Sequence, residues 1–254
     1  DNLQVTADFC HYWLSGVEKG IVYDEEVKKA GVGGIAVFAN GCVGGLMTSL
    51  GCKIHDPWLD QTFEKASFEK ARAQGYRLAD LVLQKLANGP WLTVDQPAIR
   101  LWARTFAFKV DNHLFKLGGA LRVLDRGFVG MSAMRTEVNL LTLGTQVSIL
   151  TLPGEVYPEI VNGGVQAPEG RDFINAKADQ PSLRSLMPGS CKFVIGLAND
   201  EIGYIIPKSQ WDRKPPYLYD SNRPVYGEIN SLGPETAPRL HAAFRALCET
   251  SESH

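Results

Sequence analysis

Apolar residues recur at helical spacing in three parts of the chain. One face repeats over residues 6–19, a second over 61–88, and a third from Pro234 towards the C-terminus. Repeats of this period bury one side of a helix, so each part is predicted to be helical. The second pattern ends at the Asn-Gly-Pro sequence 88–90, a typical helix stop. The predicted inner faces are Phe9, Tyr12, Trp13 and Val17; Leu78, Val82 and Leu86; Leu240, Ala243, Phe244 and Leu247.

Shorter apolar runs bounded by turn residues predict strands between these helices. They span residues 35–39, 99–108, 120–124, 136–143, 147–152 and 193–197. Residues 162–190 are rich in Gly, Pro, Asp and Ser, and predict a long loop of the kind that often carries function. Helices and strands therefore alternate unevenly along the chain, which indicates a mixed α/β fold.

Composition narrows the class of protein. The 254 residues are 44% hydrophobic and 21% charged, enough for a full core in one large domain or two small ones. The net charge of −2 and the isoelectric point near 6.2 favour neither nucleic acid nor an anionic lipid surface as partner. No apolar stretch is long enough for a transmembrane segment, and the first residues lack the layout of a signal peptide.

The cysteines and histidines do not identify a disulfide framework or a metal site by their spacing. The five cysteines are too scattered for a disulfide scaffold, although Cys42 and Cys52 could pair in an oxidising compartment or remain small buried side chains. None of the five histidines has a neighbour at metal-ligand spacing, and His11 and His241 fall on predicted helices. The common nucleotide-binding, zinc-protease and serine-hydrolase motifs are absent.

Three predicted strand ends pass polar residues into loops. They are "FANGCVGGLMTS" from Phe38, "LPGE" from Leu152 and "LANDEIGY" from Leu197. Strand ends are where distant parts of a chain converge on a ligand. Taken alone, Glu155 is compatible with an exposed acid in a surface turn. Thr48 or Ser49 is compatible with a glycine-rich loop whose backbone groups hydrogen-bond within the loop. Tyr204 is compatible with a half-buried aromatic side chain.

Five segments in order resemble the later part of the catalytic region of the neutral/alkaline ceramidase family. They are "DNLQVTADF", "GGIAVFANGCVGGLMTS", "LTLPGEVYPEI", "FVIGLANDEIGYIIPKSQW" and "YGEINSLGPETAPRL". The resemblance runs with gaps from Asp1 to about Leu240. It implies an αββα-like fold, with two sheets packed between helical layers, of which this chain is the later part. It also favours an extracytoplasmic or secreted location.

The resemblance also implies a zinc site. In the family, one zinc is held by two histidines, a glutamate and a tyrosine, and the metal polarises an amide carbonyl and activates water. The glutamate of the Pro-Gly-Glu turn matches Glu155, and the tyrosine after the Asn-Asp pair matches Tyr204, which we also assign to catalysis. A catalytic serine of the family has Thr48 as its nearest counterpart, or Ser49 after a one-residue shift. A threonine stands at the matching position, and its hydroxyl can still donate a hydrogen bond.

Both zinc histidines of the family lie upstream of the segment that "NLQVTADF" resembles. We therefore expect residues 1–254 to form a single incomplete domain, whose two missing Zn²⁺ ligands come from a companion chain. The predicted activity is hydrolysis of a linear N-acyl amide, with a small-molecule or lipid amide as substrate. The residues beyond "PGE" differ from the ceramidase form, so ceramide itself is not implied.

Two alternatives remain open at this stage. The first is a metal-independent hydrolase that uses Thr48 or Ser49 with a histidine such as His55. The second is a binding subunit of the same fold that lacks metal and catalysis. Glu155 and Tyr204 both match zinc-ligand positions of the family. This agreement favours the zinc amidase over the two alternatives.

Overall fold

The fold was analysed in a computed structural model, which describes residues 4–46, 48–94, 97–124, 127–130, 132–164, 172–173, 176, 181–217 and 220–252. The chain divides into two compact units. The N-terminal unit contains residues 1–39 and 48–93, and the C-terminal unit contains residues 40–47 and 94–254. Each is described by itself. The described part contains seven α-helices, three two-stranded sheets and one five-stranded mixed sheet, which confirms the mixed α/β class.

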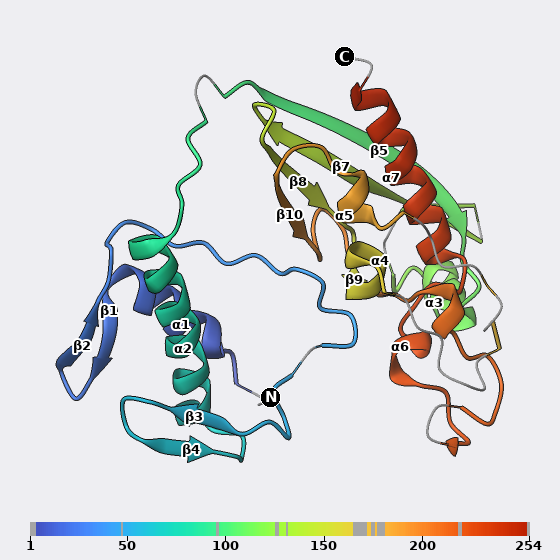
Figure 1. The fold of residues 1–254 in the computed structure, drawn as a ribbon. Helices are drawn as coiled ribbons and strands as arrows, with labels where there is room; N and C mark the ends of the chain where they lie inside the picture. Colours follow the sequence, from blue (N-terminus) through green and yellow to red (C-terminus); the bar gives the residue numbers. More distant parts are fainter. Residues whose placement is uncertain are drawn as a thin grey trace. The chain divides into compact units, whose positions relative to one another are not determined.

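The N-terminal unit is built on two packed helices, α1 (Asp8–Glu18) and α2 (Phe68–Asn88) (Figure 1). Two antiparallel hairpins complete it. The first pairs β1 (Gly20–Tyr23) with β2 (Glu26–Ala30), and the second pairs β3 (Ile54–Asp56) with β4 (Gln61–Phe63). The Ser67 hydroxyl caps α2 by accepting a 3.1 Å hydrogen bond from the Lys70 backbone amide.

The main sheet of the C-terminal unit has the strand order β10-β8-β7-β5. Its strands are β5 (Ile99–Lys109), β7 (Ala133–Leu143), β8 (Val147–Thr151) and β10 (Cys191–Ile195), and the short β6 (Phe128–Val129) also pairs with β7. The β10–β8 pair is parallel and the other pairs are antiparallel. A second, two-stranded parallel sheet joins β9 (Glu155–Val156) to β11 (Tyr204–Ile205).

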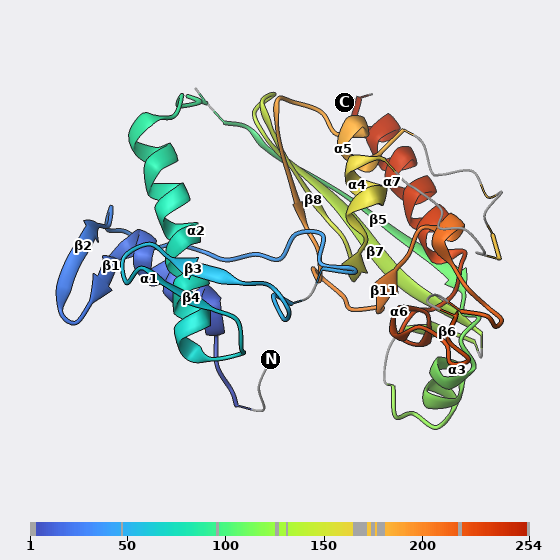
Figure 2. The ribbon, with the colours of Figure 1, turned by 60° about the horizontal axis from the view of Figure 1, so that its bottom comes forward.

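Helices cover one face of the main sheet (Figure 2). The long α7 (Thr236–Glu252) contacts β5 and β7, while α4 (Pro158–Asn162) and α5 (Leu183–Leu186) lie beside it. Alternate strand residues such as Val138, Leu140 and Leu150 enter one buried cluster with Phe244 of α7. The remaining short helices are α3 (His113–Ala120), η1 (Lys208–Gln210) and α6 (Tyr226–Ile229).

Several residues on the other side of these strands are apolar and exposed. Ile99 and Leu101 of β5 are 70% and 63% exposed, and Phe193 of β10 is 57% exposed. Because successive side chains of a strand point to opposite faces, these residues lie on the face away from the Phe244 cluster. The main sheet therefore has one helix-covered face and one face that carries exposed apolar side chains near its β5 and β10 edges.

The predicted helices are confirmed near residues 6–19, 61–88 and 234 onward, although α2 begins at Phe68 because residues 61–63 form β4. The strands predicted at 99–108, 136–143, 147–152 and 193–197 are confirmed as β5, β7, β8 and β10. Two strand predictions are wrong. Residues 35–39 form no strand, and residues 120–124 contain the end of α3 and a turn.

Other sequence predictions have different outcomes. The long loop predicted over residues 162–190 contains α5 at its end, and most of its middle lies outside the described residues. The two hairpins of the N-terminal unit and the helix α3 were not predicted. Among the described helices, none has the length and apolarity needed to cross a bilayer.

Candidate functional site

Glu155 and Tyr204, the two predicted metal ligands, lie directly opposite each other on the paired strands β9 and β11. The Glu155 amide donates a 3.1 Å hydrogen bond to the Gly203 carbonyl, and the Tyr157 amide donates one of 3.1 Å to the Ile205 carbonyl. Glu155 is half-buried and Tyr204 is buried. The structure therefore brings together two residues that are far apart in the sequence.

The environment of Tyr204 keeps its phenol protonated. Burial, followed by the hydrogen bond to Glu155 and the charge of that carboxylate, raises the pKa of Tyr204 well above its ordinary value. The Tyr226 ring of α6 packs edge-on against the Tyr204 ring, with centroids 5.9 Å apart. A protonated phenol is a donor, so the Tyr204 hydroxyl donates to the carboxylate of Glu155.

Backbone hydrogen bonds hold the "LPGE" turn against the "GLANDEIGY" segment. The Leu197 amide donates to the Gly154 carbonyl at 3.1 Å, and the Ile202 amide donates to the Pro153 carbonyl at 2.8 Å. Glycine is required at position 154, because a Cβ atom there would lie 2.5 Å from the Gly203 carbonyl oxygen. The close approach of these backbones sets the register that aligns Glu155 with Tyr204.

The glycine-rich loop reaches the same place through its first part, residues 40–46. The Gly196 amide donates to the Asn40 carbonyl at 2.9 Å, and the Gly44 amide donates to the Val156 carbonyl at 3.0 Å. A Cβ atom on Gly44 would lie 2.6 Å from the Glu155 carbonyl oxygen. The convergence predicted for the three polar loops is therefore confirmed for residues 40–46, 153–155 and 196–204.

The acidic residues before Tyr204 act in positioning. The Asp200 carboxylate accepts hydrogen bonds from the Thr136 hydroxyl at 3.0 Å and the Glu201 amide at 2.8 Å. The Glu201 carboxylate accepts one of 2.7 Å from the Gly203 amide. These contacts fasten the loop to β7 and fix the backbone that leads into β11.

Thr48 and Ser49 belong to the N-terminal unit and are described there. The Thr48 hydroxyl accepts a 3.1 Å hydrogen bond from the Leu50 amide, and the Ser49 carbonyl accepts one of 2.9 Å from the Lys70 ammonium. The His55 Nδ1 atom lies 3.3 Å from the Thr62 hydroxyl. These contacts shape the local turn and the β3–β4 hairpin, so the catalytic role of Thr48 stays a prediction.

The other candidate ligands are dispersed. Within the described residues, no three His, Cys, Asp or Glu side chains are grouped so that they could hold a metal ion. His241 is buried on α7, and its Nε2 atom lies 2.7 Å from the Pro181 carbonyl oxygen, so its ring has a hydrogen-bond partner in the core. Cys42 and Cys52 both have free thiols, so they do not form a disulfide with each other.

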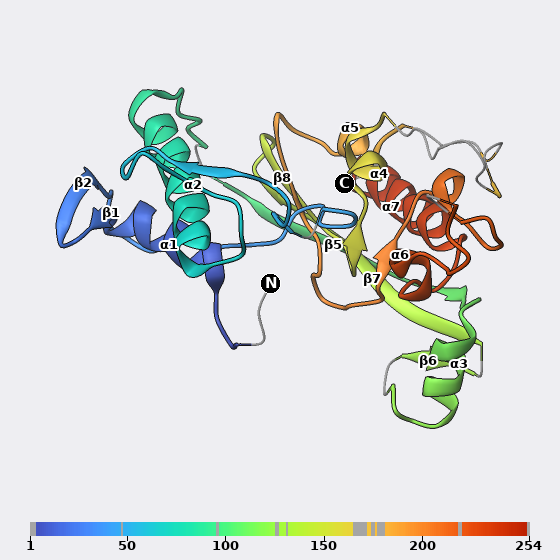
Figure 3. The same cartoon turned by 90° about the horizontal axis from the view of Figure 1, so that it is seen from below.

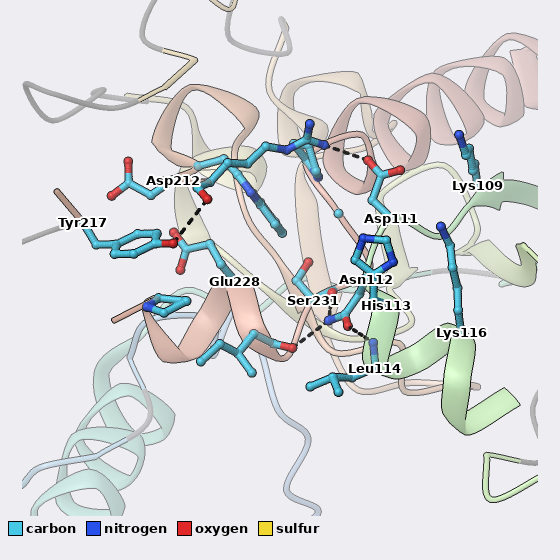
Figure 4. Close-up of a pocket in the computed structure, with 16 residues that line it drawn as sticks. Lys109, Asp111, Asn112, His113, Leu114, Lys116, Asp212, Tyr217, Glu228 and Ser231 are labelled. Carbon is cyan, nitrogen blue, oxygen red and sulfur yellow. Dashed lines mark hydrogen bonds and ion pairs between the residues drawn. The ribbon is translucent and has the colours of Figure 1, made fainter. Parts of the chain in front are cut away.

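A pocket of about 670 Å³ is lined by residues of α3, of α6 and of the segment around Trp211 (Figure 4). One wall contains an ion pair of 2.9 Å between Arg213 and Asp111. Another contains Trp211, which shares a buried cluster with Tyr204. Sequence reasoning missed this pocket because its polar residues are scattered between positions 109 and 234, with no local motif.

A scan against protein-family models finds no matching family, and a search of curated proteins finds no matching relative. The structure itself shows a mixed α/β protein in which Glu155 and Tyr204 lie opposite each other on β9 and β11.

Proposed function

We propose that this chain supplies Glu155 and Tyr204 to a zinc-dependent site that hydrolyses a linear N-acyl amide, as the resemblance to neutral/alkaline ceramidases implies. The pairing of Glu155 with Tyr204 carries the proposal. Two residues that the resemblance assigns to one metal, 49 positions apart in the chain, are adjacent in space. If the resemblance were due to chance, there would be no reason to expect these two residues to be adjacent in the fold.

The donor set of this chain fits half of a zinc site. A carboxylate and a phenol offer two oxygen donors, and zinc commonly takes four ligands that include oxygen and imidazole nitrogen. The proposal assigns the two imidazoles to a companion chain. When bound, zinc would supply a Lewis acid for the amide carbonyl and a water of pKa about 7.

The residues of this chain orient and shield the site. The Tyr204 hydroxyl, which keeps its proton, is a hydrogen-bond donor beside Glu155, and its buried ring limits the access of water. With the Glu155 carboxylate engaged by zinc, the Tyr204 phenol would be placed to stabilise a developing oxyanion. Thr48, or Ser49 in its place, remains the proposed third catalytic group, acting through its hydroxyl.

The proposed complete fold is the αββα-like arrangement of two sheets between helical layers. The helix-covered main sheet would form half of it, and residues 1–254 would be part of a larger domain. The exposed apolar side chains of Ile99, Leu101 and Phe193 support a second sheet as their cover. Sheets pack face to face through surfaces of this kind, about 10 Å apart.

The decisive experiment measures zinc content and amide hydrolysis of the native assembly with Glu155→Gln. We expect loss of at least nine-tenths of the bound zinc and of the activity, because a neutral amide is a much poorer zinc ligand than a carboxylate. Glu159→Gln, the same change four residues away, is the matched control and should retain both. A Glu155→Gln protein with full zinc content would remove Glu155 from the metal.

The same preparation separates the alternatives. Activity that survives a strong chelator would support the metal-independent hydrolase with Thr48, Ser49 and His55. A native assembly with neither zinc nor activity against N-acyl amides would support a binding subunit. Native mass spectrometry tests for the companion chain directly, and a screen of N-acyl amides of varied chain length tests the lipid character of the substrate.

A further inference from the structure

Helix α3 and the segment that leads to β6 form a small lobe at one end of β7 (Figure 3). We call residues 113–124 and 127–129 the α3–β6 lobe. Five large apolar side chains of this lobe are between 52% and 77% exposed. They are Leu114, Leu117, Leu121, Val123 and Val129.

The exposed leucines are fixed in place by the other side of the helix. Leu114, Leu117 and Leu121 follow i, i+3, i+7 spacing and share one face. The opposite face is held by Phe115, which packs against the main core, and by Gly119, whose Cβ position is 2.6 Å from the Phe128 ring.

The N-terminus of α3 is also anchored. The Asn112 side chain accepts hydrogen bonds from the Leu114 and Phe115 amides at 3.0 and 3.3 Å. Its amide group donates to the Ile229 and Ser231 carbonyls at 2.7 and 2.9 Å. The helix is therefore attached firmly to the rest of the unit, and the exposure of its leucines is a feature of the folded state.

The described residues of the lobe include Lys116 and Arg122 and no acidic side chain. Residues 109–135 contain five Lys or Arg and two Asp, a net charge of +3 in a chain whose net charge is −2. Lys109 and Lys116 extend to the same side of the pocket (Figure 4). The carboxylate of the nearby Asp111 forms an ion pair with Arg213. Its negative charge is therefore shared and does not fully offset the positive charge of the two lysines.

We propose that the α3–β6 lobe binds the surface of a bilayer that contains anionic phospholipids. Exposed apolar side chains on one face of a short helix, in a lobe that also carries lysine and arginine, are typical of a segment that lies in the membrane interface. The positive charge complements anionic headgroups. The same charge opposes contact between two copies of the lobe, which makes a second copy a poorer occupant.

The inference goes beyond the proposed amidase and does not depend on it, because vesicle binding is measured without substrate. The probe is flotation of the native protein with vesicles of phosphatidylcholine alone, or of phosphatidylcholine mixed with phosphatidylglycerol. We expect binding to the mixed vesicles, with a strong decrease as salt screens the charges. Absence of binding to the mixed vesicles at low salt would overturn the proposal.

Variants of the lobe test which side chains make the contact. Lys109→Gln with Lys116→Gln should weaken the partition by about fivefold for each lysine. Leu117→Ser with Leu121→Ser should weaken it by about tenfold for each leucine that enters the interface. The matched controls are Lys85→Gln and Leu81→Ser on α2, where Leu81 is 58% exposed, and these should bind as the unchanged protein does.

Two further results would contradict the proposal. Binding that the lobe variants do not reduce would place the membrane contact elsewhere. Protection of the Leu114, Leu117 and Leu121 side chains from hydroxyl-radical footprinting in the native assembly without vesicles would mean that a protein already covers the lobe. Because all substituted side chains are exposed or at the rim, unfolding measurements should show that each variant retains its stability.

Discussion

A buried Tyr-Asp contact stabilises the N-terminal unit at the level of single residues. The Tyr23 hydroxyl donates a hydrogen bond to one carboxylate oxygen of Asp56, which is fully buried. The other oxygen accepts bonds from the Trp58 and Leu59 amides at 2.9 and 3.2 Å. The Arg72 guanidinium lies 4.6 Å from the centre of the Tyr23 ring. A charge removed from water is tolerated here because each of its oxygens is hydrogen-bonded.

Tyr23→Phe is predicted to lower the free energy of unfolding by about 1–3 kcal/mol, because it leaves a buried carboxylate oxygen without its donor. Urea denaturation followed by tryptophan fluorescence measures the change. Tyr12→Phe is a suitable control, since Tyr12 packs edge-on against Tyr76 in the same aromatic cluster. Equal stability of Tyr23→Phe and the unchanged protein would show that the hydrogen bond contributes nothing.

The same contact predicts a decrease of stability at alkaline pH. Burial and the hydrogen bond to Asp56 raise the pKa of Tyr23 above its ordinary value. The folded state therefore favours the protonated phenol, and this contribution is complete below the unfolded pKa of about 10 and is lost as pH rises above it. Stability should fall by about 1.4 kcal/mol per pH unit there, and Tyr23→Phe should fall less steeply in urea titrations at the same pH values.

Local sequence patterns predicted some of the important residues and missed others. Glu155 and Tyr204 could be chosen in advance because each stands in a short segment that resembles a family motif in the right order. The partnership of Tyr23 with Asp56 could not, because the residues are 33 positions apart and neither has a distinctive local pattern. Pairings of that kind depend on how the helices and hairpins pack, which no local signal encodes.

At the scale of elements, the contact between α1 and α2 depends on a glycine within a helix. A Cβ atom on Gly75 would lie 2.6 Å from the Tyr12 Cβ atom and 2.9 Å from the Trp13 backbone nitrogen. The two helices are therefore closer than any side chain at position 75 allows. The cost of placing glycine inside a helix, about 1 kcal/mol relative to alanine, is offset by this packing.

Gly75→Ala should consequently destabilise the protein, although helix propensity alone predicts a gain of about 1 kcal/mol. We expect a loss of about 1–3 kcal/mol, because the overlap involves backbone that has no room to move. Thermal or urea unfolding gives the sign, and the sign is the test. A more stable Gly75→Ala protein would mean that α1 and α2 separate without cost.

Helices and strands were predicted correctly where the apolar repeat extends over many residues. The prediction failed where tertiary packing determines the secondary structure. The eleven-residue strands β5 and β7 and the helices α2 and α7 each carry repeats that are unambiguous. Residues 35–39 look like a buried strand, yet Ile35 and Val37 are 90% and 86% exposed. A strand needs a neighbouring backbone to pair with, and an apolar run alone does not provide one. Helix α3 was missed because it has only eight residues, two of them glycine, and so shows no clear helical period.

At the scale of the whole molecule, the main sheet has an unequal distribution of apolar surface. One face is closed by the α7 layer and contributes Leu140 and Leu150 to the core. The other retains exposed Ile99 and Leu101 on β5. Large exposed apolar faces are uncommon in isolated proteins and usually mark a contact. The αββα-like proposal accounts for this face as the position of a second sheet.

Leu101→Lys tests that proposal separately from the metal site. Leu101 is 63% exposed, so the substitution should change the unfolding free energy of the isolated chain by no more than about 0.5 kcal/mol. It should nevertheless weaken association with the companion chain, because a charge would be buried between two sheets, and zinc content should fall with it. Val27→Lys, at a residue of β2 that is 57% exposed, is the control for an added charge. If Leu101→Lys retains both companion and zinc, the second sheet does not cover this face, while the assignment of Glu155 would stand on its own test.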